Sequence, residues 1–195
     1  MSGKQREGTL EKNRLADFDL RELIFVDANI FIDHGSANPI YGKSCEEFLE
    51  DVESKNIVAI TTTAVLDEVG YILYLLEGAR ILKTEELKIV RKKLKEDQKL
   101  AVACYKKVRE YMKYIFFLGE RGLDIQKVEP KDILIATLVG GEYRLLFKDS
   151  LHLSVMKRLK IKNIATRDSD FERVGDIIIW CPYGIKTDCD EVFIK

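Results

Sequence analysis

The sequence predicts an α/β protein in which helices cover both faces of a parallel sheet. Two observations support this class. Residues 23–26 form a short apolar run without alternation, which is typical of a strand buried on both faces. Further along, segments of strand character take turns with segments of helical periodicity, as in sheets of parallel strands joined by crossover helices. With 195 residues, the chain is long enough for one domain with a sizeable core.

The strand segments are short and apolar. They are expected at residues 23–27, 57–61, 163–166 and 177–180. After the first strand, the chain is expected to turn and to continue as a loop to about residue 43. Polar tails are expected at residues 1–20 and 182–195, so that residues 21–181 form the folded domain.

The helical segments lie between the strands and have capping residues at their ends. They are expected at about residues 45–54, 63–76, 84–97, 99–118, 130–139 and 149–159, with a helical turn at 170–173. Ser44, Thr84 and either Thr62 or Thr63 are the expected N-caps, while Pro130 suits a first helical position. Glycines should end two of these helices, at Gly78 and at the pair formed by residues 140 and 141.

The composition is that of a globular protein without a strong overall charge. Hydrophobic residues make up 46% of the chain and the formal net charge is −1, so contact with a polyanion requires a local basic patch. No apolar stretch reaches the roughly 18 residues of a membrane span, and the N-terminus lacks a signal-peptide core. Cys45, Cys104, Cys181 and Cys189 form no CxxC pair, so we expect reduced thiols and a cytoplasmic protein, with a Cys181–Cys189 bridge left open.

Acidic residues recur where the expected elements bring them to one edge of the sheet. Asp27 ends the first strand and Asp168 follows a later one, which places both at the carboxyl edge. Glu68 lies on the flank of an apolar stripe of its expected helix, whereas Asp67 lies on the side of that helix away from the stripe. Asp149 shares a helical face with core residues.

Each acid also has a purely structural interpretation. Asp27 would suit an Asx turn, Glu68 a helix surface and Asp149 an N-cap. Asp168 would be an ordinary turn acid, and Asp170 is expected to cap the helical turn that follows it.

Together, however, the acids favour a divalent cation. Close carboxylates repel one another and raise each other's pKa unless a cation neutralises them, and we expect no His, Cys or Lys partner beside these four. Mg²⁺ and Mn²⁺ prefer carboxylate oxygens and can activate water for phosphodiester hydrolysis. The set therefore predicts a metal site that acts on nucleic acid.

The same residues lie in motifs that resemble those of the PIN-domain nucleases, which include the VapC toxin ribonucleases of toxin–antitoxin modules. The motifs are VDANIFID, AVLDEVGYIL, PKDILIATLVGGEYRLLFKDSLHLSVMKRL, and IATRDSDFERV followed by IIIW; they occur in family order over about residues 23–180. The resemblance implies a PIN-like three-layer α/β/α sandwich with a central parallel sheet.

The resemblance also implies roles for individual residues. The catalytic acids that bind Mg²⁺ or Mn²⁺ would be Asp27, Glu68, Asp149 and Asp168. Residues that support the site would be Asn29 and Thr166, by hydrogen bonding, and Asp170, as an auxiliary acid. The implied activity is endoribonuclease hydrolysis that leaves a 5′-phosphate, with an antitoxin protein as a partner.

Two alternatives remain. The first is a PIN-like module that binds RNA or protein without catalysis. The second, a phosphotransferase of the haloacid-dehalogenase type, would need an Asp where the chain has Asn29.

Residues 79–123 exceed the length of compact family members and are expected to form a projecting helical hairpin. Within it, residues 83–113 carry eleven basic and five acidic side chains, a formal charge of +6. This charge suits a phosphate-contacting surface or an ordinary solvated hairpin. The many apolar residues at 111–118 are expected to form core plus a surface for a homodimer or an antitoxin. His152 is expected to be a packed structural histidine.

Overall fold

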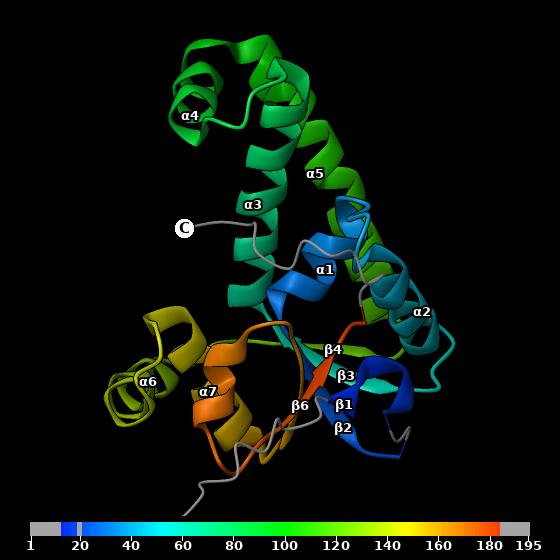
Figure 1. Ribbon diagram of the computed structural model, residues 1–195, viewed down its shortest axis with the longest axis vertical. Helices are drawn as coiled ribbons and strands as arrows, with labels where there is room; N and C mark the ends of the chain where they lie inside the picture. Colours follow the sequence, from blue (N-terminus) through cyan, green and yellow to red (C-terminus); the bar gives the residue numbers. More distant parts are fainter. Residues whose placement is uncertain (1–12, 19–20, 184–195) are drawn as a thin grey trace, which may run out of the picture.

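A single parallel sheet organises the computed structural model, which describes residues 13–18 and 21–183 (Figure 1). In spatial order its strands are β1 (Asn13–Arg14), β6 (Ile178–Cys181), β5 (Asn163–Ala165), β2 (Leu23–Val26), β3 (Val58–Thr62) and β4 (Leu123–Gln126). All the neighbouring pairs are parallel, so the predicted class of sheet is confirmed.

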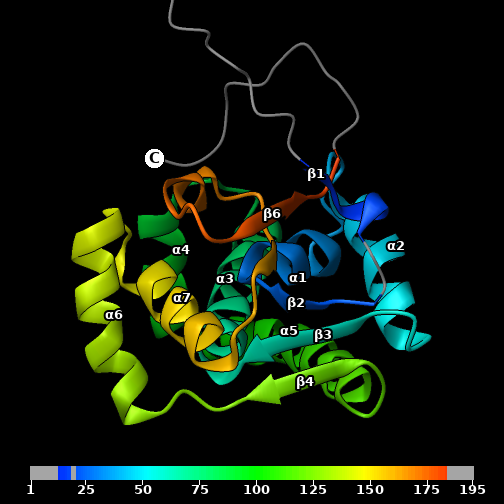
Figure 2. The same cartoon turned by 90° about the horizontal axis from the view of Figure 1, so that it is seen from below.

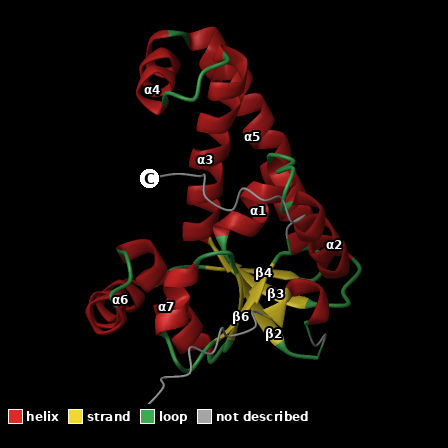
Figure 3. Ribbon diagram, viewed as in Figure 1, coloured by secondary structure: helices red, strands yellow, loops and turns green. Residues whose placement is uncertain are grey.

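Helices lie on both sides of this sheet (Figure 2). They are α1 (Ala28–Gly35), α2 (Gly42–Glu53), α3 (Thr63–Leu82), α4 (Leu87–Glu96), α5 (Gln98–Gly119), α6 (Pro130–Tyr143) and α7 (Phe147–Leu159), with short 3-10 helices η1 (Leu15–Asp17) and η2 (Ser169–Arg173). The arrangement is the expected α/β/α sandwich, and Figure 3 shows its strands gathered in one sheet with helices around it. Among the described residues, no helix combines the length and the apolar character that a membrane span requires.

The core forms where the sequence is most apolar. Ile24, Phe25 and Val26 of β2 are fully buried, since β2 has β5 on one side and β3 on the other and helices over both faces. The register between β2 and β5 pairs Val26 with Ala165. The next residues along the two strands, Asp27 and Thr166, therefore leave the sheet side by side.

The expected helical hairpin is present, and it projects from the sheet (Figure 1). α3 and α5 run side by side away from the strands and carry α4 near their far end. A small second core joins the three helices, built from Leu75, Val90, Leu94, Leu100 and Cys104. This separate core explains how the far end of the hairpin stays ordered, while the near parts of α3 and α5 pack into the main core.

Gly78 does not end α3, as the sequence suggested, but lies inside it. The helix continues to Leu82 and ends at Lys83, which adopts a left-handed conformation. A Cβ at Gly78 would lie 3.0 Å from Val90 and 3.1 Å from Leu94 of α4. The glycine therefore permits close helix packing, a role that only the tertiary contact reveals.

The glycine pair at 140 and 141 is likewise internal, because α6 runs on to Tyr143. A Cβ at Gly140 would lie 2.6 Å from Ser150 Oγ of α7, whereas one at Gly141 would meet no atom within 4 Å. Two adjacent glycines thus have opposite surroundings. Gly140 lets α6 approach α7, and Gly141 faces outward.

We expect Gly140→Ala to destabilise the protein by about 1–3 kcal/mol, because the added methyl would displace a buried hydroxyl. Ser150 Oγ cannot move freely, since it donates to the Leu146 carbonyl at 2.8 Å. The matched control is Gly141→Ala, which should stabilise α6 by about 0.5–1 kcal/mol. Denaturant unfolding at equal protein concentration measures both values, and equal effects of the two variants would contradict this packing.

Several local expectations were wrong. Residues 28–35 form α1 rather than a turn and loop, since an eight-residue helix is too short to show clear periodicity. Ser44 is buried inside α2, whose N-cap is Tyr41, and Thr84 lies before the N-cap of α4, Glu86. The strand β4 was not expected. At the N-cap of α3, Thr62 rather than Thr63 accepts a hydrogen bond from a backbone N–H.

Part of the expected N-terminal tail belongs to the fold. Asn13 and Arg14 pair with β6, and Leu15 and Phe18 are buried in the core. The ring of Phe18 meets that of Trp180 edge-on, with centroids 5.2 Å apart. The other expected tail residues, at 1–12, 19–20 and 184–195, lie outside the described part of the chain.

Two of the four cysteines are buried free thiols, Cys45 and Cys104. Burial raises the pKa of Cys45 to about 12, so this group stays protonated at neutral pH. Cys189, and with it the open question of a Cys181–Cys189 bridge, lies outside the described residues.

Candidate metal centre

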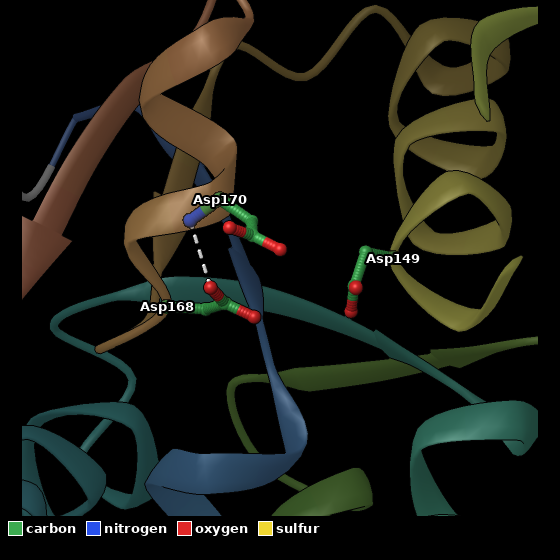
Figure 4. Close-up of side chains that lie close together, drawn as sticks. All are labelled: Asp149, Asp168 and Asp170. Atoms are coloured by element: carbon green, nitrogen blue, oxygen red, sulfur yellow. Dashed lines mark hydrogen bonds between the residues drawn. The ribbon is translucent and has the colours of Figure 1, made fainter. Parts of the chain in front are cut away.

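Three aspartates converge beside the carboxyl end of β5 (Figure 4). Asp149 lies in the first turn of α7, Asp168 precedes η2, and Asp170 lies within η2. One carboxylate oxygen from each lies within 4.8 Å of the others. Two of the four acids expected to bind metal, Asp149 and Asp168, are thus together, and the third member is the expected auxiliary acid.

The tight turn after β5 orients this group. Asp168 Oδ1 accepts a hydrogen bond from the Asp170 N–H at 2.8 Å, so Asp168 is the N-cap of η2 (Figure 4). The expectation that Asp170 caps this turn was therefore wrong. Its carboxylate instead accepts from Arg173 Nη2 at 2.7 Å, one turn along the helix.

Asp27 follows the neighbouring strand, β2, and lies at the centre of a hydrogen-bond network. It is the N-cap of α1 and is only 6% exposed. Its carboxylate accepts three hydrogen bonds of 2.6 Å, from the Ala28 N–H, Asn29 Nδ2 and Thr166 Oγ1. Burial raises the pKa of Asp27, and the bonds from Thr166 and Ala28 oppose that rise.

Asn29 and Thr166 connect Asp27 to the three-aspartate group. Thr166 Oγ1 accepts from the Asp168 N–H at 3.0 Å and from Asn29 Nδ2 at 2.8 Å. Asn29 Oδ1 in turn accepts from the Arg167 N–H at 3.2 Å. The hydrogen bonding that the resemblance implied for Asn29 and Thr166 is present, and it fixes the end of β2 to the end of β5.

We expect Thr166→Val to destabilise the fold by about 1–3 kcal/mol, because it removes a fully buried hydroxyl and leaves the Asp168 N–H and the Asp27 carboxylate each one partner short. The control is Thr137→Val on the exposed face of α6, which should change stability by less than about 0.5 kcal/mol. Urea unfolding measures both. Equal values for the two variants would show that the network contributes nothing.

Asp33 and Arg167 supply a second connection that the sequence did not reveal. The Asp33 carboxylate is 2% exposed and accepts from Arg167 Nε at 2.6 Å. The guanidinium also lies over the Tyr41 ring, 4.7 Å from its centroid. This ion pair holds α1 against the segment that carries Asp168.

The electrostatics show that four neighbouring acids act on Asp149. Burial first, and then the charges of Asp168, Asp27, Glu68 and Asp170 in that order, together raise the pKa of Asp149 to about 7. A group with this pKa is half protonated near neutral pH. An added cation would remove the repulsion and return Asp149 to its charged form.

The expectation that no Lys or His lies beside the acids was wrong. Lys148 Nζ is 3.3 Å from Glu68 Oε1, because the starts of α3 and α7 converge. His152 Nε2 is 3.9 Å from Asp27 Oδ1. Both contacts join residues at least 80 positions apart, so no pattern within one helix indicates them.

His152 is packed, as expected, but it also borders the site. It is 2% exposed, lies against Phe25 with ring centroids 5.6 Å apart, and burial lowers its pKa to about 4. The ring is therefore neutral at physiological pH and does not offset the acids' charge. Its Nδ1 has no hydrogen-bond partner among the described residues.

This donor set fits a hard divalent cation. Three carboxylates offer oxygen ligands within reach of one ion, and Asp27 and Glu68 add negative charge nearby. Lys148 and Arg173 each pair with one of these acids. The remaining charge is still negative, and Mg²⁺ or Mn²⁺ would neutralise it with the ligand atoms that these ions prefer.

Comparison with a family model identifies the family and its fold. The PIN domain model matches residues 24–177, most of the chain, which therefore belongs to the PIN domain family. The match confirms the family assignment that the sequence motifs suggested. Comparison with curated proteins found no match.

Solved structures of similar fold come from toxin–antitoxin systems. A toxin–antitoxin complex from Klebsiella pneumoniae matches with a TM-score of 0.52 and 16% identity, over 83% of this chain and 99% of that one. VapBC2 from Rickettsia felis, bound to a DNA fragment from its promoter, has a TM-score of 0.48 and 17% identity over 82% and 98%. VapC20 from Mycobacterium tuberculosis, a toxin that cleaves the sarcin–ricin loop, has a TM-score of 0.48 and 18% identity over 79% and 96%.

Proposed function

We propose that this protein is a Mg²⁺- or Mn²⁺-dependent endoribonuclease that leaves a 5′-phosphate. The observation that carries the proposal is the group of Asp149, Asp168 and Asp170, whose oxygens lie within 4.8 Å of one another on a PIN fold. The pKa of Asp149 supports it, since burial and then the neighbouring acids raise that pKa, and a bound cation would stabilise the charged carboxylate.

The three-aspartate group would hold the ion, and Asp27 and Glu68 complete the proposed catalytic set. A bound divalent ion would lower the pKa of water and stabilise the charge that develops on the phosphate. Asp27 keeps Thr166, and through it the Asp168 backbone, in place. Glu68 holds the Lys148 ammonium beside the acids, where it can contact a phosphate oxygen.

The projecting helices offer a surface for RNA. Tyr71 lies one helical turn beyond Glu68 on α3 and is 46% exposed. The Arg91 guanidinium of α4 lies over its ring, 6.0 Å from the centroid. An aromatic ring paired with a cation suits stacking by an unpaired base, and the basic side chains of α4 and α5 suit its phosphates.

We further propose a toxin role, with an antitoxin protein as partner and the cytoplasm as location. The toxin–antitoxin complex from Klebsiella pneumoniae supports this proposal through fold alone. The alternative is a PIN-like module that binds RNA or protein without cleaving. The acid set favours the enzyme, because five mutually repelling carboxylates give a pure binding module no evident advantage.

The experiment is a cleavage assay with the full-length protein and a mixed-sequence single-stranded RNA. We expect fragments with 5′-phosphate ends in Mn²⁺ or Mg²⁺, no fragments in EDTA, and loss of cleavage in Asp27→Asn. RNA binding without cleavage in either metal would favour the binding module. Cleavage that persists in EDTA or in Asp27→Asn would show that the acids described above are not the site.

A further inference from the structure

One side of α3 connects the acids to α4. Five positions recur there at alternating spacings of three and four residues and therefore form a single stripe along the helix. The stripe consists of Glu68, Tyr71, Leu75, Gly78 and Leu82. Its last three positions pack into the small core that α3 shares with α4, whereas Glu68 contacts Lys148 of α7. α4 and α7 accordingly lie on the same side of α3 (Figures 1 and 2).

Tyr71 lies between the two ends of this stripe with its ring open to a ligand. It is 46% exposed, while Leu75 and Gly78, which follow it on the stripe, are buried. No other aromatic ring stacks on it among the residues that the structure describes. Three residues advance a helix by about 4.5 Å, so the ring lies one turn from Glu68. A planar group could therefore bind Tyr71 while the chain attached to it reaches the acids.

A cation from α4 forms the other side of this opening. Arg91 Cζ is 6.0 Å from the centroid of the Tyr71 ring, at the outer limit of a cation–π contact. The guanidinium has no ion pair or hydrogen bond within the described residues. By contrast, the cations over the rings of Tyr41 and Tyr143 each pair with an aspartate.

The spacing of the two groups suits an inserted base. A flat group in contact with the ring on one side and the guanidinium on the other needs about 7 Å between them, twice an ordinary contact distance. The Arg91 side chain is flexible and exposed, so it can widen the present separation by the small amount required. The opening therefore fits a single planar, unpaired base.

Beyond the ring, α4 offers unpaired positive charge. Its ten residues include five basic and one acidic, a formal charge of +4. Lys92 and Lys93 share Glu96, each at 3.8 Å, whereas Lys88 and Lys95 have no ion pair within the described part of the chain. A strand that passes from Tyr71 towards α4 would meet cations that are free to contact its phosphates.

We propose that Tyr71 and Arg91 hold one unpaired base of the RNA between them, and that this contact determines which phosphate is cut. The inference rests on the proposed ribonuclease function, because the acids define where the cut phosphate lies. Since one helical turn separates Tyr71 from Glu68, the held base belongs to a nucleotide within about two positions of that phosphate. Stacking tolerates every base, so the site selects an unpaired nucleotide and not a sequence.

Fluorescence of a stacked base tests the site without cleavage. The probe is a short oligouridine with one central 2-aminopurine, whose fluorescence falls on stacking, mixed with the full-length protein in EDTA. We expect binding with quenching for the wild type and for Tyr71→Phe, which keeps the ring. Tyr71→Ala should abolish the quenching and weaken binding about tenfold, and Arg91→Ala should reduce both.

The matched control is Phe116→Ala. Phe116 is a similarly exposed aromatic residue, at 57%, but it lies beside Val58 at the amino end of β3, whereas α3 starts at the carboxyl end of that strand. It should leave binding and quenching unchanged. Equal quenching in the wild type and Tyr71→Ala, or RNA that the wild type does not bind and quench, would overturn the proposal. Far-UV circular dichroism confirms that each variant is folded.

An abasic nucleotide tests the register. Moved one position at a time along a cleavable RNA, it should lower kcat/KM of the wild type about tenfold at one position near the cut, where the stacked base is lost. In Tyr71→Ala the same abasic nucleotide should cause no further loss, because base and ring act as a pair. Independent losses would overturn the register. Quenching without cleavage in either metal would instead refute the ribonuclease and leave the stacking site in place.

Discussion

Asp149→Asn is expected to lower kcat/KM for RNA cleavage by at least about 10³-fold. The substitution keeps the shape of the side chain and removes its negative charge, which four neighbouring acids repel. One carboxylate of the three-aspartate group is then lost, and with it part of the charge and ligand set that would hold the divalent ion. The other acids stay in place, so the loss should come from weaker ion binding and not from unfolding.

The matched control for this variant is Asp67→Asn. Asp67 precedes Glu68 on α3 and is exposed to solvent, so the same change of charge should leave cleavage within about twofold of the wild type. Initial rates over a series of Mn²⁺ concentrations would separate weakened ion binding from lost chemistry. Asp149→Asn activity within tenfold of wild type at Mn²⁺ concentrations that do not saturate the wild type would exclude Asp149 as a ligand.

The second large effect expected is a pH-dependent stability of the metal-free protein. Because the folded-state pKa of Asp149 is about 7 against an ordinary 3.8, the folded state holds a proton that the unfolded state has lost. The contribution of Asp149 to stability is therefore unchanged below about pH 4, falls as the pH rises towards 7, and stays low above it. In EDTA, Asp149→Asn should match the wild type near pH 4 and exceed it at pH 8.

Mn²⁺ should reverse the order of these two proteins at pH 8. An ion that binds the folded state alone, at 100 times its dissociation constant, adds about 2.7 kcal/mol, or about 5–10 °C in melting temperature for a chain of this size. Thermal unfolding with and without Mn²⁺ gives both comparisons. The titration of His152, near pH 4, is common to the two proteins and cancels in their difference. An Mn²⁺ shift equal in both proteins would argue against ion binding at Asp149.

Much of the fold could be predicted because buried segments are recognisable by their apolar local composition. The fully apolar stretch of β2 indicated a central strand, and β2 has strands on both sides. β4 and α1 were missed, since a partly exposed four-residue strand and an eight-residue helix are too short for periodicity to show. β1 was missed because its two exposed residues resemble a solvated tail.

By itself, the sequence determined that strands would alternate with helices and that acids would follow the strand ends. Both properties depend on residues close together along the chain. Only the tertiary structure decided which carboxylates meet. It brought Asp170 into the three-aspartate group and Lys148 beside Glu68, and it made Gly140 a packing contact. The physical reason is that these contacts depend on how the helices pack against one another. Such packing brings together residues that are far apart along the chain, at separations that follow no period, so no periodic pattern indicates them.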